Sequence, residues 1–313
     1  MQKLIKIIAL IFGTVFLLWF SESTIESVMK SVKHDEIGKI NGVINHDIDN
    51  EIMIWGASTA YVNFVPKRID SALNMSCFNM GLNGTNIDQF NGLLKEYLSY
   101  SQKCKYLVII IDIRSGLTKR NKIYDPFNWV HHYDNDNIYN CLKQIDDETM
   151  IKARYVPFYP LILYDKNTFR YFRKELLNPT KKYDFPNLGS CFQPAPIFKA
   201  KKTKPFRSKI DGRVLDKVIS SCDLALEKNI IPILVMPPCY KEGLQILQNI
   251  QEIEDTLRNT KNKETYLFNF VNTSISESPE LFKDYTHLNY SGAIKLTDLL
   301  IKEIKRIEAS IKP

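Results

Sequence analysis

Two short motifs near opposite ends of the sequence contain the residue types of a serine nucleophile and its base. An apolar run ends in Trp55-Gly56-Ala57-Ser58, and much later Asp284 precedes His287 by three residues. A hydroxyl is a weak nucleophile until a base removes its proton, and an imidazole that a carboxylate holds in one tautomer is the usual base. The pattern predicts Ser58 as nucleophile, His287 as general base and Asp284 as the acid that orients the histidine. This chemistry requires no cofactor.

Each of these residues also has a purely structural interpretation. Ser58, or its neighbour Thr59, suits a turn or a helix cap, and Asp284 suits a capping turn. His287 suits a hydrogen-bonded histidine beside the start of a helix. Either motif alone occurs often by chance. Their order, their places at the two ends of one alternating region and a glycine loop between them make the combination specific.

Strand and helix patterns alternate on both sides of a long irregular segment. Apolar runs predict strands at 51–55, 75–80, 106–111, 230–236 and 265–270. Helical spacing of apolar residues predicts helices at 65–73, 86–100, 212–228, 242–258 and 290–307. This alternation predicts an α/β fold, a three-layer doubly wound parallel sheet that is covered by helices on both faces.

The candidate residues follow predicted strands. Ser58 follows the first strand, the 81–86 loop the second and 112–114 the third, and the loop of Asp284 and His287 follows the fifth. In doubly wound sheets the reactive residues lie at the carboxyl ends of the strands. We therefore expect the four segments to converge on one edge of the sheet.

With these residues laid out, the chain resembles the SGNH (GDSL-like) hydrolase superfamily over residues 50–114 and 212–310. The matching blocks are Gly56-Ala57-Ser58, the loop from Asn79 to Gly84, and Asp284 with His287. The resemblance implies a flavodoxin-like topology with Ser58, Asp284 and His287 as the catalytic triad. It also implies that the Gly84 amide serves the oxyanion hole, with Asn83 as a further candidate there.

The third block of the family is different in this chain. The family usually ends its third strand with Gly-x-Asn-Asp, and that asparagine completes the oxyanion hole. Here the run is Ile110 to Ser115, and Arg114 stands nearest the missing asparagine. Arg114 has three possible roles: stabilising the oxyanion, holding an anionic substrate group, or pairing with Asp112. Membrane-anchored relatives that acylate or deacylate cell-surface polymers often lack this block, and the chain resembles them more than secreted lipases.

The first residues predict a membrane anchor. Lys3 and Lys6 precede an apolar run that extends to Phe20 without a small-x-small cleavage site. This pattern predicts a signal anchor over 1–22, with the lysines inside and the remainder outside the cytoplasm, in the periplasm or extracellular space. A cleaved signal peptide and a buried N-terminal helix are the alternatives. We expect a stalk over 23–50 and the SGNH-like α/β domain over 51–313. Residues 115–210 are expected to be an insertion over the carboxyl edge of the sheet, as a cap or a substrate-binding region.

Composition and residue spacing argue against nucleic-acid binding and against a metal site. The net charge is +7 without a basic helix or an aromatic-basic repeat, which argues against nucleic-acid binding. The six cysteines form no C-x-x-C pair, and His131 and His132 are adjacent and lack an evident third ligand, so we predict no metal site. The insertion is rich in aromatic residues, which either stack on sugar rings or form its own small core.

The sequence thus predicts a serine esterase or O-acyltransferase at the cell membrane. We expect it to act on O-acyl groups, acetyl above all, of an extracytoplasmic polysaccharide through an acyl-enzyme on Ser58. A transferase would receive its acyl group from an integral-membrane partner. The alternative is a catalytically inactive SGNH-like binding or assembly protein of the cell envelope. A lipid or thioester hydrolase is a third hypothesis, against which the polar, basic insertion argues.

Overall fold

Five parallel strands form the centre of the fold. The computed structural model of the chain describes residues 1–192 and 204–311. The strands are β1 (Ile52–Trp55), β2 (Cys77–Asn79), β3 (Tyr106–Ile110), β4 (Ile231–Met236) and β5 (Tyr266–Asn269). They are all parallel and stand in the order β2-β1-β3-β4-β5. This confirms the predicted doubly wound sheet, and the order is the flavodoxin-like one.

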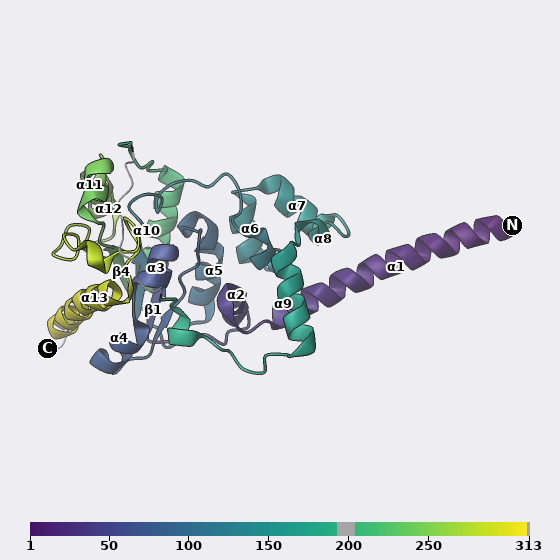
Figure 1. Cartoon of the computed structure of the whole chain (residues 1–313), viewed down its shortest axis with the longest axis horizontal. Coiled ribbons are helices and arrows are strands. Elements are labelled where there is room, and N and C mark those ends of the chain that lie inside the picture. Colours follow the sequence, from purple (N-terminus) through teal and green to yellow (C-terminus); the bar gives the residue numbers. More distant parts are fainter. Residues whose placement is uncertain (193–203, 312–313) are drawn as a thin grey trace.

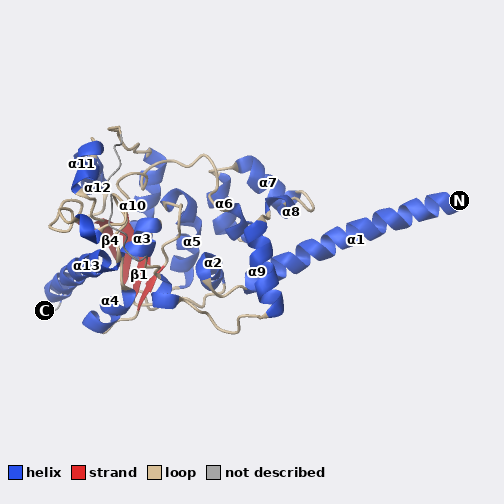
Figure 2. Cartoon of the chain, viewed as in Figure 1, coloured by secondary structure: helices blue, strands red, loops and turns tan. Residues whose placement is uncertain are grey.

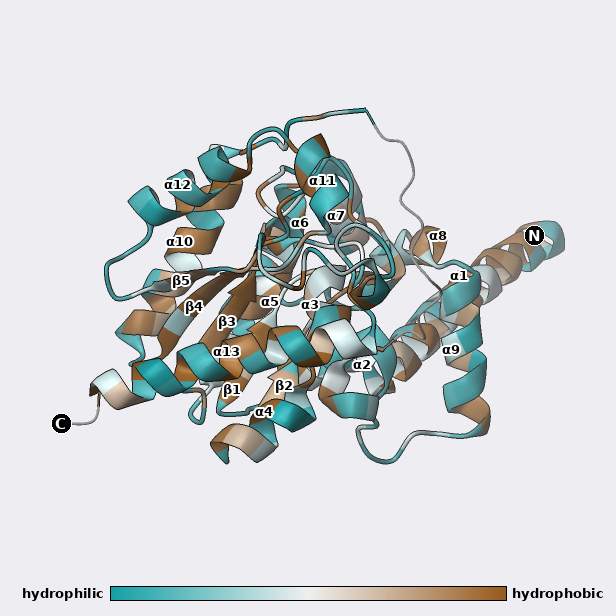
Figure 3. Cartoon of the chain, turned by 60° about the vertical axis from the view of Figure 1, so that its left-hand side comes forward, coloured by the Kyte–Doolittle hydropathy of each residue, from teal (hydrophilic) through white to brown (hydrophobic). Residues whose placement is uncertain are grey.

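The sheet is covered by helices on both faces, as Figures 2 and 3 show. One face packs against α5 (Ile87–Tyr100), α10 (Gly212–Glu227) and α12 (Ile250–Thr260). The other face packs against α3 (Ser58–Asn63), α4 (Pro66–Leu73) and α13 (Tyr290–Ile311). Successive strand residues point to opposite faces, so Met53 and Trp55 lie in the first core while Ile52 and Ile54 lie in the second. Burial on both faces explains why these strands are continuous apolar runs.

The helix predicted over 242–258 is wrong as a single element. The chain instead forms α11 (Lys241–Ile246), then an extended residue at Leu247, then α12. Leu247 forms a β-bridge with Phe206, whose amide donates to the Ile246 carbonyl and whose carbonyl accepts from the Gln248 amide. These backbone groups are paired outside the helix, and the helical hydrogen-bond ladder stops there.

The N-terminal helix α1 (Gln2–Ser31) projects from the folded domain, as Figure 1 shows. Its residues up to Ser21 are exposed, whereas Ile25 and Met29 are buried against the domain. Within residues 1–192 and 204–311, it is the one helix that is long and apolar enough to cross a membrane. This finding agrees with the predicted anchor in length and composition.

The stalk predicted over 23–50 is not a separate segment. After α1 the chain forms α2 (Asp35–Ile44), whose residues from Ile37 to Val43 are all buried. Ile40, Val43 and Ile48 belong to the core that also contains α5 and the sheet. The prediction failed because the segment is polar in composition, while its buried polar groups find partners elsewhere in the domain.

In its described part, the long insertion contains four short α-helices: α6 (Asp136–Lys143), α7 (Asp147–Tyr155), α8 (Pro160–Leu163) and α9 (Lys166–Leu177). Helix α6 packs on α5, and α9 packs on α1. Figure 1 shows these helices beside α5, at the end of the domain from which α1 projects. The described helices widen the helical layer, and α9 contributes Asn167, Arg170 and Tyr171 to a pocket that Tyr61 and Asn83 also line. Residues 193–203, also assigned to the predicted cap, lie outside the described residues.

Candidate active site

Ser58 stands at the first residue of α3, directly beyond the carboxyl end of β1. A Cβ atom on Gly56 would lie 2.8 Å from the Ala60 Cβ and 2.9 Å from the Ile110 Cβ, so only glycine lets the helix begin so close to the strands. The amides in the first turn of a helix have no intrahelical partner. The Ser58 amide is therefore available beside its own hydroxyl. The neighbouring Thr59 is fully buried, whereas Ser58 is partly exposed.

The base and the acid come from the loop between β5 and α13. Asp284 Oδ1 accepts hydrogen bonds from the amides of Thr286 (3.0 Å) and His287 (2.9 Å), which form a tight turn. Asp284 Oδ2 lies 2.7 Å from His287 Nδ1, and His287 Nε2 lies 2.8 Å from Ser58 Oγ. The three predicted catalytic residues thus form one continuous chain of hydrogen bonds at the carboxyl edge of the sheet.

The charge of Asp284 is stabilised within this turn. Burial raises the pKa of the carboxyl, but hydrogen bonds from the His287 ring and from the amides of Thr286 and His287 outweigh burial and lower it to about 2. Asp284 is therefore ionised at neutral pH and accepts the Nδ1 proton of His287. This arrangement leaves Nε2 of the neutral imidazole free to accept the Ser58 proton.

Asn63, which the sequence analysis missed, ties the nucleophile helix to the base loop. Its side chain is fully buried at the end of α3. Its Nδ2 donates to the Thr286 carbonyl at 2.9 Å, and its Oδ1 accepts from the Leu288 amide at 2.8 Å. The two bonds hold the backbone on both sides of His287. In the sequence Asn63 is an ordinary helix-end asparagine, and no local signal indicates partners more than 200 residues away.

The loop after β2 also lies at α3. Asn79 donates to the Ala60 carbonyl at 2.7 Å and accepts from the Gly81 amide at 2.7 Å. Gly84 has a left-handed φ of +64°, and a Cβ there would lie 2.3 Å from the Tyr124 ring. Across the described part of the chain, the Gly84 amide has no hydrogen-bond partner, as its predicted oxyanion role requires. Asn83 differs, because its amide already donates to Glu36 Oε1 at 3.0 Å.

Lys39 of α2 forms a hydrogen bond to the loop after β2. Its side chain is fully buried, its Nζ donates to the Gly81 carbonyl at 2.7 Å, and it lies 4.2 Å from the centre of the Tyr61 ring. Burial lowers the pKa of Lys39 to about 7, although the nearby Glu36 carboxylate acts in the opposite direction. The sequence analysis missed both residues because it placed them in a stalk.

The end of β3 lacks the family's asparagine amide, and Arg114 does not form the ion pair with Asp112 that was one alternative. The Asp112 carboxylate instead accepts from the backbone amides of Arg114 (2.9 Å) and Ser115 (3.0 Å). The exposed Arg114 guanidinium lies over the Phe206 ring, 5.9 Å from its centre. Arg114 lines a small cavity of about 40 Å³ with Cys239 and with Tyr285, the residue next to Asp284. It thus remains a candidate for contact with a substrate group.

His131 and His132 are buried in the helical layer. His132 Nε2 lies 2.7 Å from Asn41 Oδ1, and burial lowers the pKa of both rings, that of His132 to about 3. Within the described ranges no three His, Cys, Asp or Glu side chains are grouped as metal ligands. Of the insertion's aromatic residues, Trp129 is in the main core, whereas Tyr155 is exposed. These residues therefore do not form one continuous sugar-binding surface.

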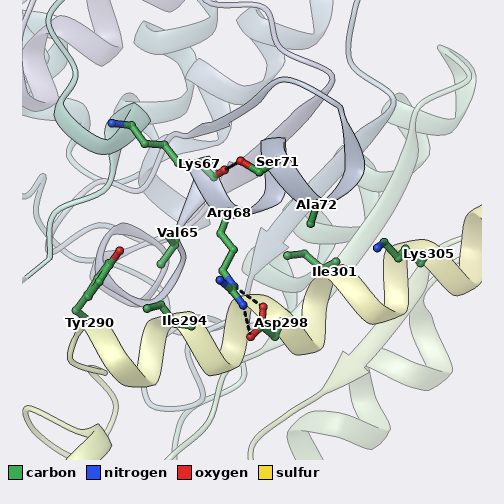
Figure 4. A pocket seen from close by; sticks show the side chains of 10 residues that line it. All are labelled: Val65, Lys67, Arg68, Ser71, Ala72, Tyr290, Ile294, Asp298, Ile301 and Lys305. Carbon is green, nitrogen blue, oxygen red and sulfur yellow. Dashed lines mark hydrogen bonds and ion pairs between the residues drawn. The ribbon is translucent and has the colours of Figure 1, made fainter.

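Several larger pockets lie near α3 and α4, and two of them bear on the argument. Figure 4 shows the first, a groove between α4 and α13, where Arg68 reaches Asp298 with an Nη2–Oδ2 distance of 2.9 Å. The second, of about 360 Å³, is bounded by Tyr61, one helical turn after Ser58, and by Asn83 of the β2 loop. Its other walls carry acidic, amide, basic and aromatic side chains: Asp35, Glu36, Tyr124, Asp125, Phe127, Asn128, Asn167, Arg170 and Tyr171. We call this second pocket the Tyr61 pocket.

Comparison with known proteins adds little to this picture. No family model matches the sequence, and no curated protein matches it. Among solved structures, the chain is similar to a protein from Desulfitobacterium hafniense DCB-2 that is assigned to the G-D-S-L lipolytic family. The TM-score is 0.39 and the identity 10%, over 81% of this chain and 99% of that one.

Proposed function

We propose that the chain is a membrane-anchored serine esterase or O-acyltransferase that acts on O-acyl groups of an extracytoplasmic polysaccharide. One observation carries the proposal: the chain of hydrogen bonds from Asp284 through His287 to Ser58 Oγ, with distances of 2.7 and 2.8 Å. A buried serine cap would not need an imidazole oriented by a carboxylate. This arrangement matches the requirements of a nucleophile, a general base and its orienting acid.

The reaction follows from the roles of these groups. Ser58 Oγ attacks the ester carbonyl while His287 Nε2 takes its proton, and Asp284 stabilises the imidazolium that forms. The amides of Ser58 and Gly84 are the candidate donors to the developing oxyanion, and one such donor lowers a barrier by about 3 kcal/mol. The imidazolium then protonates the leaving alcohol, which leaves an acyl-enzyme on Ser58. Water resolves it in an esterase, and a sugar hydroxyl resolves it in a transferase.

The Tyr61 pocket supports a carbohydrate substrate. Aromatic rings offer flat apolar faces, and carboxylates and amides offer donors and acceptors for hydroxyl groups. Tyr61 stands one turn after Ser58 on α3, so the helix that carries the nucleophile also contributes a wall of this pocket. Helix α1 keeps such an enzyme at the membrane, where an integral-membrane partner supplies the acyl group if the reaction is a transfer.

A fluorophosphonate probe tests the nucleophile. We expect the purified full chain to be labelled, and Ser58→Ala to lose labelling, because the probe reacts only with an activated serine. Ser71→Ala is the matched control, since Ser71 is an exposed serine on the neighbouring helix α4. Equal labelling of the wild type and Ser58→Ala would remove Ser58 from this role. A wild-type chain that is never labelled would favour the inactive binding protein.

The substrate class is tested separately with O-acetylated oligosaccharides and their saponified forms. We expect acetate release from the acetylated forms, and a KM raised about tenfold in Asn128→Ala, because this variant removes polar groups from the Tyr61 pocket. Its fluorophosphonate labelling should stay unchanged. Arg68→Ala in the groove of Figure 4 is the control and should keep the wild-type KM. Hydrolysis of a simple acetyl ester with no use of any oligosaccharide would contradict the carbohydrate substrate.

A further inference from the structure

An exposed apolar segment connects α7 to α8 at the end of the domain from which α1 projects. The segment 155–162 reads Tyr-Val-Pro-Phe-Tyr-Pro-Leu-Ile. Tyr155 is 67% exposed, Val156 47% and Ile162 75%. Beyond the N-terminal helix, Ile162 is the most exposed large apolar side chain of the described residues. Apolar groups gathered in this way indicate a surface that meets another apolar phase.

The position of this segment along α1 is fixed by direct contacts. Leu161 and Leu163 pack in one cluster with Ile25 and Met29 of α1. The Phe158 amide faces the Glu22 carboxylate of α1. Figures 1 and 3 both show α8 beside α1. The segment therefore lies level with residue 22, just beyond the point where the exposed apolar run of α1 ends.

The backbone of Phe158 has an unusual conformation at the point where the segment approaches α1. Phe158 has a φ of +66°, in the left-handed region that an aromatic residue rarely adopts. Its amide is the group that faces Glu22, so the unusual conformation and the approach to α1 occur at the same residue. Ile162 stays exposed, whereas Leu161 and Leu163 on both sides of it are packed.

The apolar run of α1 is a few Å shorter than the hydrocarbon core of a bilayer. Leu4–Phe20 spans roughly 17 residues, or about 25 Å of helix, whereas the hydrocarbon core of a bilayer is about 30 Å thick. A span that is a few Å short draws its flanking groups into the interface. Tyrosine and apolar residues are the types that reside there. Residues 155–162 lie beside the end of α1 at which the apolar run is too short to reach the bilayer surface.

We propose that residues 155–162 insert into the outer interface of the bilayer that α1 crosses. The inference rests on the proposed membrane anchoring. The occupant of the surface is lipid, because the segment packs on the same helix whose exposed apolar run ends a few residues earlier, at Phe20. Two contacts, α1 and this segment, then fix how the domain sits on the membrane. The Ser58 site is held in one orientation instead of turning freely on a tether.

The test uses the full chain in nanodiscs of phosphatidylcholine and phosphatidylglycerol. An NBD fluorophore is attached at Ile162→Cys in a Cys191→Ser background, because the other five cysteines are buried. The matched control is Ile311→Cys, the same residue type at 56% exposure at the opposite end of the molecule. Leu10→Cys reports on the anchor itself. We expect blue-shifted emission and quenching by doxyl-labelled lipid at positions 10 and 162, and neither at position 311.

The outcomes separate this inference from the anchoring on which it rests. Lipid quenching at position 10 with position 162 behaving like position 311 overturns the inference and leaves the anchor intact. No quenching at position 10 overturns both. In a third outcome, position 162 is exposed to water in nanodiscs that contain no other protein but is shielded in native membranes. This would show that a partner protein covers the surface, which also overturns a lipid contact.

Discussion

At the scale of single residues, the site depends on one buried asparagine as well as on the triad. Asn63 touches no reacting atom, yet it holds the backbone on both sides of His287. We expect Asn63→Ala to lower kcat about 10- to 100-fold with little change in KM, because a displaced base weakens proton transfer without removing a substrate contact. Its free energy of unfolding should fall by about 1–3 kcal/mol, because two backbone groups lose their partner. Ester hydrolysis and thermal unfolding measure the two effects.

The control for Asn63 is Asn41, another fully buried asparagine that bonds two backbone carbonyls, those of Met29 and Val32. Asn41→Ala should lose stability and keep the wild-type kcat, since its partners Met29, Val32 and His132 do not lie beside His287. If both variants lost kcat equally, Asn63 would have only a general structural role.

At the scale of elements, α2 supports the active-site loop through a buried lysine. The pKa of Lys39 is about 7 in the fold, against an ordinary 10.5, so between these values the unfolded chain binds more protons than the folded one. The free energy of unfolding should therefore rise as the pH increases from 7 towards 10.5. In Lys39→Met this contribution should vanish. Unfolding at about pH 7 and about pH 9.5 measures it, with the exposed Lys67→Met as control. If the free energy of unfolding of Lys39→Met depended on pH as that of the wild type does, the lowered pKa of Lys39 would be contradicted.

At the scale of the whole molecule, α1 is long and apolar enough to join the domain to a membrane, and the lysines in its first turns predict the side. Lys3 and Lys6 favour the cytoplasmic side, so the domain should face outward. In intact cells a membrane-impermeant maleimide should label Ile311→Cys in the Cys191→Ser background, whereas Gln2→Cys should react only after permeabilisation. The opposite pattern would place the domain inside the cytoplasm and exclude an extracytoplasmic polysaccharide.

Much of this fold could be predicted, because the signals involved are local. The strands are apolar runs long enough to be buried on both faces, and parallel strands bring their carboxyl ends to one edge. That rule alone predicted that Ser58 and the loop of His287 would meet. The single helix over 242–258 and the stalk failed for the opposite reason. Leu247 is held by Phe206, and Lys39 by Gly81, both about 40 residues away in the sequence.

The order of apolar runs and the two polar motifs already specified the sheet, the anchor and the residue types of the site. Folding added what depends on distant partners: the burial of α2, the Asn63 contacts that hold His287, and the place of residues 155–162 beside α1. Hydrophobic periodicity and composition indicate only whether a residue is buried in the core or exposed to solvent. Hydrogen bonds between segments more than 200 residues apart depend on where the completed core places each backbone group.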